Sequence, residues 1–220
     1  RITRAGMFGG GWPIKPGEIS LAHKGVLYLD EIPEMNRGVL EGLRQPLEEG
    51  VVTLSQGWGS LCLPADFQLV GSANPCYCGF YGDGRQACRC TPYQLKQYHN
   101  KLSGPLLDRM DMRVQVPRVE LDQFSSANAL PECSAQVRDR VIRVRQLQAD
   151  REKDPAWCLR VLQQELTPTA RSFLQAMSEE SHLSARGYTR VLQLARTIAD
   201  MAGEEGISEA AVAEALQFRG

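Results

Sequence analysis

Two adjacent acids end a short apolar run near the start of the chain. The run extends from Val26 to Leu29, and Asp30 and Glu31 follow it. It is typical of a buried parallel strand covered on both faces, in which polar and apolar residues need not alternate. Ligands gather where such strands end, and the pair fits a Walker-B motif, in which Asp30 holds Mg²⁺ and Glu31 polarises an attacking water. The alternative is a core strand followed by a solvated acidic turn.

A second apolar run, Phe67 to Val70, also leads to a polar side chain. Small residues follow it, and then comes Asn74. If this strand lies beside the first, the amide of Asn74 would point near Glu31 and a γ-phosphate, where it would position the attacking water. Asn74-Pro75 is alternatively a simple turn initiator.

The segment between these runs predicts a β-hairpin. Its strands are Val51 to Ser55 and Leu61 to Leu63, and Trp58 lies at its tip. An aromatic residue there can bind a partner by stacking on a base or a peptide, or it can fold back onto the protein. No Lys or Arg occurs between Val51 and Pro64, which disfavours tracking of phosphates by this loop.

Four of the seven cysteines are clustered in two Cys-x-Cys pairs. They are Cys76, Cys78, Cys88 and Cys90, and the segment between the pairs is rich in glycine. Four converging thiolates form a closed structural Zn²⁺ site with no open position for catalysis. Reduced thiols and disulfides are the alternatives, and disulfides are disfavoured by the odd cysteine count and the lack of an export signal.

Arg109 lies in a turn between acids, just before a predicted strand from Met112 to Pro117. It forms either a local ion pair or an arginine finger that reaches the γ-phosphate of a neighbouring subunit. The phosphate-binding pattern G-x-x-x-x-G-K-[ST] is missing from the 220 residues. We therefore expect the chain to be the later portion of a longer polypeptide, and by itself neither to bind ATP tightly nor to hydrolyse it.

The remaining elements must position these side chains. We expect a loop or irregular insert over residues 1–18, one helix over the sheet between Asn36 and Gly50, and a helix from Pro92 to Tyr98. Beyond Pro117 the chain becomes helical. A helix is expected from Ser134 to Arg151, with an apolar stripe made of Val137, Val141, Val144 and Leu147. Further helices begin at the capping residues Thr167, Ser184 and Ser208. The sequence thus predicts an α/β core over residues 1–118 and a small helical domain over 119–220.

Bulk composition restricts the classes of partner. A net charge of −1 excludes polyanion binding by the chain as a whole but leaves room for a local basic patch. No apolar run has membrane-spanning length, and no secretory signal opens the chain. We expect a cytoplasmic protein without a membrane partner.

Four consecutive stretches resemble one family. They are GEISLAHKGVLYLDEIPE, FQLVGSANPCYCG, CRCTP and LSGPLLDRMD, and together they resemble the magnesium-chelatase-like AAA+ ATPases of the ComM/YifB type, from about Gly17 to the C-terminus. The resemblance implies a P-loop AAA+ core with a helical lid, and ATP and Mg²⁺ as ligands. It places Asp30 and Glu31 on Walker B, Asn74 on sensor 1 and Arg109 on the arginine finger. Arg186 falls on sensor 2, which binds ATP, although it can also be a surface charge of its helix.

The resemblance also implies an activity for the intact protein. We expect a ring, a hexamer in this family, that couples ATP hydrolysis to DNA remodelling by branch migration during natural transformation. A Lon-protease-like domain and the Walker-A loop would precede residue 1. The alternatives are an ATPase that remodels a protein partner, as the true magnesium chelatases do, and a folded fragment without catalytic capacity.

Overall fold

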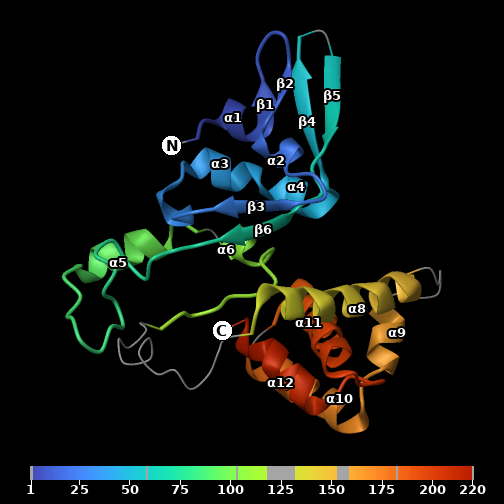
Figure 1. The fold of residues 1–220 in the computed structure, drawn as a ribbon. Coiled ribbons are helices and arrows are strands. Elements are labelled where there is room, and N and C mark those ends of the chain that lie inside the picture. The colour runs from blue at the N-terminus through green and yellow to red at the C-terminus, as the bar shows by residue number, and fades with distance from the viewer. Residues whose placement is uncertain are drawn as a thin grey trace. The chain divides into compact units, whose positions relative to one another are not determined.

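The computed structural model describes residues 2–57, 59–102, 104–117, 132–152, 159–181 and 183–219. Trp58 therefore lies outside the described residues, as does part of the segment around the predicted domain boundary. The chain divides into two compact units, Arg1–Met110 and Asp111–Gly220 (Figure 1). No helix of the described part has both the length and the apolar character that crossing a membrane requires.

A parallel pair of strands forms the centre of the first unit. β3 (Val26–Leu29) pairs with β6 (Gln68–Gly71), and Leu29 is aligned with Gly71. Leu27 and Leu29 are buried, whereas Val26 and Tyr28 are each 59% exposed. The expectation of a strand covered on both faces is therefore wrong for this structure, because its side chains alternate between a packed face and an open one.

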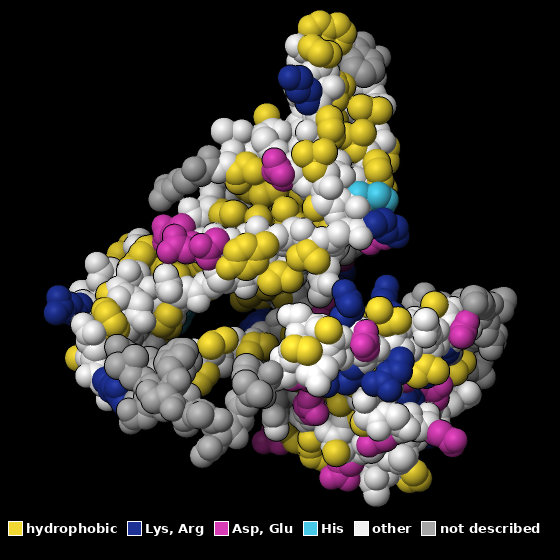
Figure 2. Space-filling model, viewed as in Figure 1, with side chains coloured by type: hydrophobic (Ala, Val, Ile, Leu, Met, Phe, Trp, Pro, Cys, Tyr) yellow, Lys and Arg dark blue, Asp and Glu magenta, His cyan; other side chains and the backbone are white. Residues whose placement is uncertain are grey.

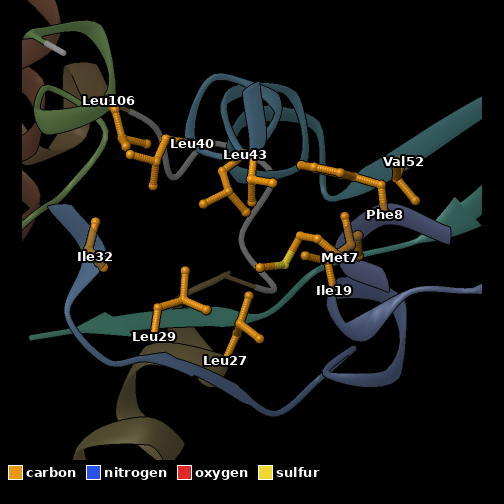
Figure 3. Packing of buried hydrophobic residues seen from close by; sticks show 12 residues of the cluster. Met7, Phe8, Ile19, Leu27, Leu29, Ile32, Leu40, Leu43, Val52 and Leu106 are labelled. Carbon is orange, nitrogen blue, oxygen red and sulfur yellow. The ribbon is translucent and has the colours of Figure 1, made fainter. Parts of the chain in front are cut away.

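Two short helices lie over the packed face. They are α3 (Arg37–Gly42) and α4 (Arg44–Glu49), where we expected one continuous helix. Pro46 lies in the first turn of α4, and its missing N–H prevents a bond back into α3. Figure 3 shows Leu40 and Leu43 on these helices pointing toward Leu27 and Leu29 of the strand.

The described N-terminal residues contain short regular elements, so the expectation of a loop or irregular insert over residues 1–18 is wrong for most of this segment. It forms α1 (Arg4–Phe8), the antiparallel pair β1 (Gly9–Gly10) and β2 (Lys15–Pro16), and the start of α2 (Glu18–Leu21). The side chain of Thr3 caps α1 by accepting from the N–H of Gly6 at 3.1 Å. Met7 and Phe8 then pack into the core (Figure 3), and this burial fixes a segment that its glycines and prolines alone would leave irregular.

The predicted β-hairpin is confirmed as β4 (Val51–Gln56) and β5 (Gly59–Pro64), paired in antiparallel register. It lies beside the β1–β2 pair (Figure 1). Leu54 of β4 comes so close to Gly9 of β1 that a Cβ atom on this glycine would be only 3.2 Å from a side-chain carbon of the leucine. Further along the chain come α5 (Pro92–His99), which matches the predicted helix, and α6 (Gly104–Leu107).

The second unit is helical, as predicted. Three helices begin at the expected capping residues Thr167, Ser184 and Ser208, each of which accepts a backbone N–H of the first turn. The expected strand at Met112 to Pro117 is wrong. This segment forms no strand, and the N–H of Arg113 donates instead to the carbonyl of Phe218 at 2.7 Å. Among the described residues of this unit the helices are α8 (Ser134–Glu152), α9 (Leu159–Gln164), α10 (Pro168–Glu180), α11 (Ala185–Ala202) and α12 (Glu209–Gln217).

A buried charge network, rather than an apolar stripe, connects α8 to α11. Of the four residues of the predicted stripe only Val144 is buried; Val137, Val141 and Leu147 are exposed. Arg151 instead forms two bonds to the buried Asp200, at 2.8 and 2.9 Å, and Asp200 also accepts from the buried Arg196. Bidentate pairing satisfies the carboxylate that burial would otherwise destabilise.

Candidate functional site

The carboxyl ends of β3 and β6 are joined through Ser72. Its hydroxyl donates a short hydrogen bond to Asp30 Oδ1 and accepts from the N–H of Glu31 at 3.1 Å, while its carbonyl accepts from Ile32 at 2.9 Å. Glu31 adopts a left-handed conformation, φ 49° and ψ 50°, which is uncommon outside glycine. The Asp30 carboxylate and the backbone of Glu31 are thus held in one turn, and both residues are exposed. Sequence reasoning missed Ser72, which is only one of several small residues after the second strand.

Asn74 lies three residues beyond the end of β6 and is exposed. Because β3 and β6 are adjacent and parallel, the segments that carry Asn74 and the two acids leave the same edge of the sheet. The role of Asn74 as a sensor stays a prediction.

The four clustered cysteines converge on one point. Their sulfur atoms all lie within 4.8 Å of one another, and three of the separations are 3.3, 3.5 and 3.7 Å. Four thiolates at about 2.3 Å from a zinc ion would be about 3.8 Å apart, so the sulfurs fit a tetrahedral cation. All described cysteines are free, which disagrees with the disulfide alternative. The backbone N–H groups of Arg89 and Phe80 lower the pKa of Cys78 to about 6, which favours the thiolate that binds a metal. For Cys88 the backbone N–H of Cys90 acts in the same direction, but burial and the hydrogen bonds with Cys78 and Cys76 raise its pKa to about 12 overall.

The cysteine loop is attached to α5 and to the acidic turn. His99 Nε2 donates to the carbonyl of Pro75 at 3.1 Å, and the ring of Tyr77 contacts that of Tyr98 edge-on, with centroids 4.8 Å apart. The ammonium group of Lys101 lies 4.7 Å from the centre of the Tyr77 ring and 2.8 Å from Glu34 Oε1. Glu34 belongs to the 3-10 turn η1 (Ile32–Glu34) that follows Glu31 directly. A chain of contacts therefore joins the cysteine loop to the turn that carries the acids.

Arg109 is engaged within the chain. Its side chain is 10% exposed, its Nη2 lies 2.7 Å from Glu48 Oε2, and its Nη1 donates to the carbonyl of Pro105 at 2.6 Å. Its Nε is buried without a hydrogen-bond partner among the described residues. This is the local ion pair considered from the sequence. An arginine finger would have to leave Glu48, and that role stays a prediction.

Arg186 is exposed on the first turn of α11 and borders an open hollow of about 500 Å³. The arginine one turn further along, Arg190, forms a short ion pair with Asp111. Cationic side chains and a helix N-terminus favour anions, so the hollow suits a phosphate chemically. The ATP contact of Arg186 stays a prediction. The lining residues of the hollow are Asp111, Ala185, Arg186, Thr189, Arg190 and Gln193.

Comparison with known proteins gives two family matches. The family described as "Magnesium chelatase, subunit ChlI" matches residues 1–124, and the corresponding C-terminal family matches residues 131–219.

Individual relatives agree with these matches. Competence protein ComM of Haemophilus influenzae is 42% identical over 97% of this chain, and YifB of Escherichia coli is 39% identical over 97%. A more distant relative, the probable DNA helicase MCM9 of Arabidopsis thaliana, is 26% identical over 86% of the chain and 27% of its own length. The chain spans about two fifths of the length of ComM and YifB, 42% of each. The resemblance carried by the four short stretches thus extends over nearly the whole sequence. The chain belongs to the magnesium chelatase ChlI family.

Proposed function

We propose that this chain is part of an AAA+ ATPase in which Asp30 holds Mg²⁺, Glu31 polarises the attacking water and Asn74 positions it. The observation that carries the proposal is the turn locked by Ser72, which holds two exposed carboxylates at the end of a parallel strand. Family membership supports the same chemistry, because P-loop ATPases use an acidic pair at this place in their sheet.

Each side chain has a separate task. A carboxylate is a hard oxygen ligand suited to Mg²⁺, which neutralises charge on the phosphates when bound. Glu31 accepts a proton from the attacking water or orients it, which a neighbouring ligand carboxylate cannot do at the same time. The backbone N–H of Glu31 donates to Asp30 Oδ1 and to the hydroxyl of Ser72, which fixes the backbone from which both side chains extend.

We propose further that the intact protein forms a ring, a hexamer, in which Arg109 acts on the neighbouring site and Arg186 contacts ATP. Arg109 lies beside Glu48 in its own unit, and Arg186 lines the hollow that Asp111 and Arg190 also border. Release of Arg109 from Glu48 would let its guanidinium bind a phosphate, which an arginine can do in bidentate fashion. By itself the chain lacks the phosphate-loop lysine and should bind ATP weakly.

DNA is the substrate that we propose for the motor, remodelled by branch migration. Two relatives support this choice by their names, a competence protein and a probable DNA helicase. The second candidate is remodelling of a protein partner, the alternative that the resemblance to the true magnesium chelatases implies. We also propose that the cysteine cluster holds a structural Zn²⁺, because its four sulfurs converge at suitable separations.

One experiment tests the ATPase and its substrate together. ATP hydrolysis by the intact protein is measured with and without DNA, at several salt concentrations, and compared with the Glu31→Gln variant. Hydrolysis that DNA stimulates, that falls with salt and that the variant lacks supports the proposal. Hydrolysis that is indifferent to DNA at low salt would favour the protein-partner alternative, and equal rates in both proteins would contradict the ATPase site.

A further inference from the structure

We propose that Trp12 and the hairpin that carries it form a binding surface for single-stranded nucleic acid, with Trp12 stacking on an unpaired base. The inference rests on the proposed action on DNA and adds a contact residue to it. Trp12 lies in the turn between β1 and β2 and is 82% exposed, although a tryptophan is normally buried to a large degree.

The neighbouring hairpin extends this surface. β4–β5 lies beside β1–β2, with Leu54 against Gly9 (Figure 1). Figure 2 shows hydrophobic side chains along these projecting hairpins, with a basic side chain among them. Hydroxyl groups add to the outer part of β4–β5, where Ser55 and Ser60 hydrogen-bond to each other at 3.2 Å. The surface thus combines an aromatic ring with small polar groups.

The charges of both hairpins suit a polyanion. Residues 1–17 and 51–64 contain no Asp or Glu, whereas the average of 26 acids in 220 residues would put three or four into 31 residues. The exposed Lys15 pairs with Gly10 across the β1–β2 pair and is the basic residue nearest in sequence to Trp12. An aromatic ring on an acid-free surface with a nearby ammonium group is the combination that single-stranded nucleic acids bind, since every base has a face on which to stack. A protein ligand would not require a surface without acidic residues, so the absence of Asp and Glu favours a nucleic acid over a protein.

Binding of a fluorescent oligo(dT) to the full chain, followed by anisotropy, tests the inference. We expect Trp12→Ala to bind about 5- to 150-fold more weakly, the effect of losing one base–aromatic stack, and Trp12→Phe to retain most of the affinity. Lys15→Gln should reduce the slope of log K against log salt by about 0.7, the value for one phosphate contact on a single strand. Tyr93→Ala is the matched control, because Tyr93 is 69% exposed but lies on α5, away from both hairpins in sequence.

A fluorescence measurement covers the case in which Trp12→Ala disturbs the hairpin. In the Trp58→Phe/Trp157→Phe variant the remaining tryptophan is Trp12, and stacking on a base should quench its emission as oligo(dT) saturates the protein.

The possible failures are distinguishable. Wild-type affinity of Trp12→Ala together with unquenched Trp12 emission would overturn the inference and leave the proposed ATPase on DNA intact. If neither the wild-type chain nor the intact protein binds an oligonucleotide, both the inference and the choice of DNA as substrate fail. If, in addition, the Trp12→Ala variant no longer binds a protein that the wild type binds, the surface is a protein-binding one.

Discussion

Lys101 and Glu34 form an ion pair of 2.8 Å between the residues that follow α5 and the turn that follows the acidic pair. The same ammonium group lies over the ring of Tyr77, between two of the clustered cysteines. Burial lowers the pKa of Lys101, but the interactions with Glu34 and Tyr77 together outweigh burial and raise the pKa overall, so the lysine stays charged at neutral pH. One side chain therefore connects the cysteine loop to the acidic turn.

We expect Lys101→Ala to lower the melting temperature by about 2–4 °C, since a partly exposed ion pair of this kind contributes roughly 1 kcal/mol or less. Lys101→Arg should restore most of the loss, because it keeps the charge near Glu34. The control is Lys96→Ala, which removes an exposed lysine of α5. Thermal unfolding measures all three, and equal melting of Lys101→Ala and the wild type would mean that the contact adds nothing.

The two acids should separate binding from turnover. In the intact protein Glu31→Gln should leave binding of Mg-ATP nearly unchanged and abolish hydrolysis, because the amide keeps the shape but cannot accept a proton. Asp30→Asn should weaken the part of ATP binding that depends on Mg²⁺. Calorimetry with and without Mg²⁺ gives the affinities, and steady-state assays give kcat. The same loss of affinity in both variants would argue against distinct roles.

The cysteine cluster should carry about one zinc ion per chain, the stoichiometry of one tetrahedral site. Metal analysis of protein purified without chelator measures it. Cys88→Ser should lose the metal and unfold at a lower temperature, whereas Cys62→Ser and Cys133→Ser should not, because these two cysteines are exposed and outside the cluster. Metal-free protein with unchanged unfolding would contradict a structural zinc site.

The sequence was informative where short-range patterns determine structure. The strands β3 and β6 could be predicted from their apolar runs, and the cysteine cluster from its Cys-x-Cys spacing, whereas the adjacency of the two strands was only a condition for the role of Asn74. The contacts around the site could not. Lys101 and Glu34 are 67 positions apart, and no local pattern distinguishes that lysine from Lys96.

Packing also decided several elements that local composition misrepresents. The glycines and prolines of residues 1–18 suggest a loop, yet burial of Met7 and Phe8 orders the segment. The apolar residues of α8 suggest a buried stripe, yet only Val144 of that stripe is buried, and Arg151 of the same helix bonds to Asp200 of α11. Both outcomes depend on residues distant in sequence, which periodicity within one element does not reveal.

The last prediction concerns Arg109, which is either an arginine finger or only the partner of Glu48 in a local ion pair. The two roles predict different effects of a change at Glu48. In the intact protein Arg109→Ala should lower kcat by roughly 10³- to 10⁵-fold if it acts as a finger, with ATP affinity retained. Glu48→Gln breaks the same ion pair but keeps the guanidinium, so it should leave kcat within a few-fold of the wild type. Mixing Arg109→Ala subunits with Glu31→Gln subunits should restore some hydrolysis, because an intact acidic site then meets an intact arginine from its neighbour. ATPase rate against mixing ratio, after subunit exchange is verified, measures this. If Glu48→Gln is as inactive as Arg109→Ala and mixing restores nothing, the arginine acts only through its local ion pair.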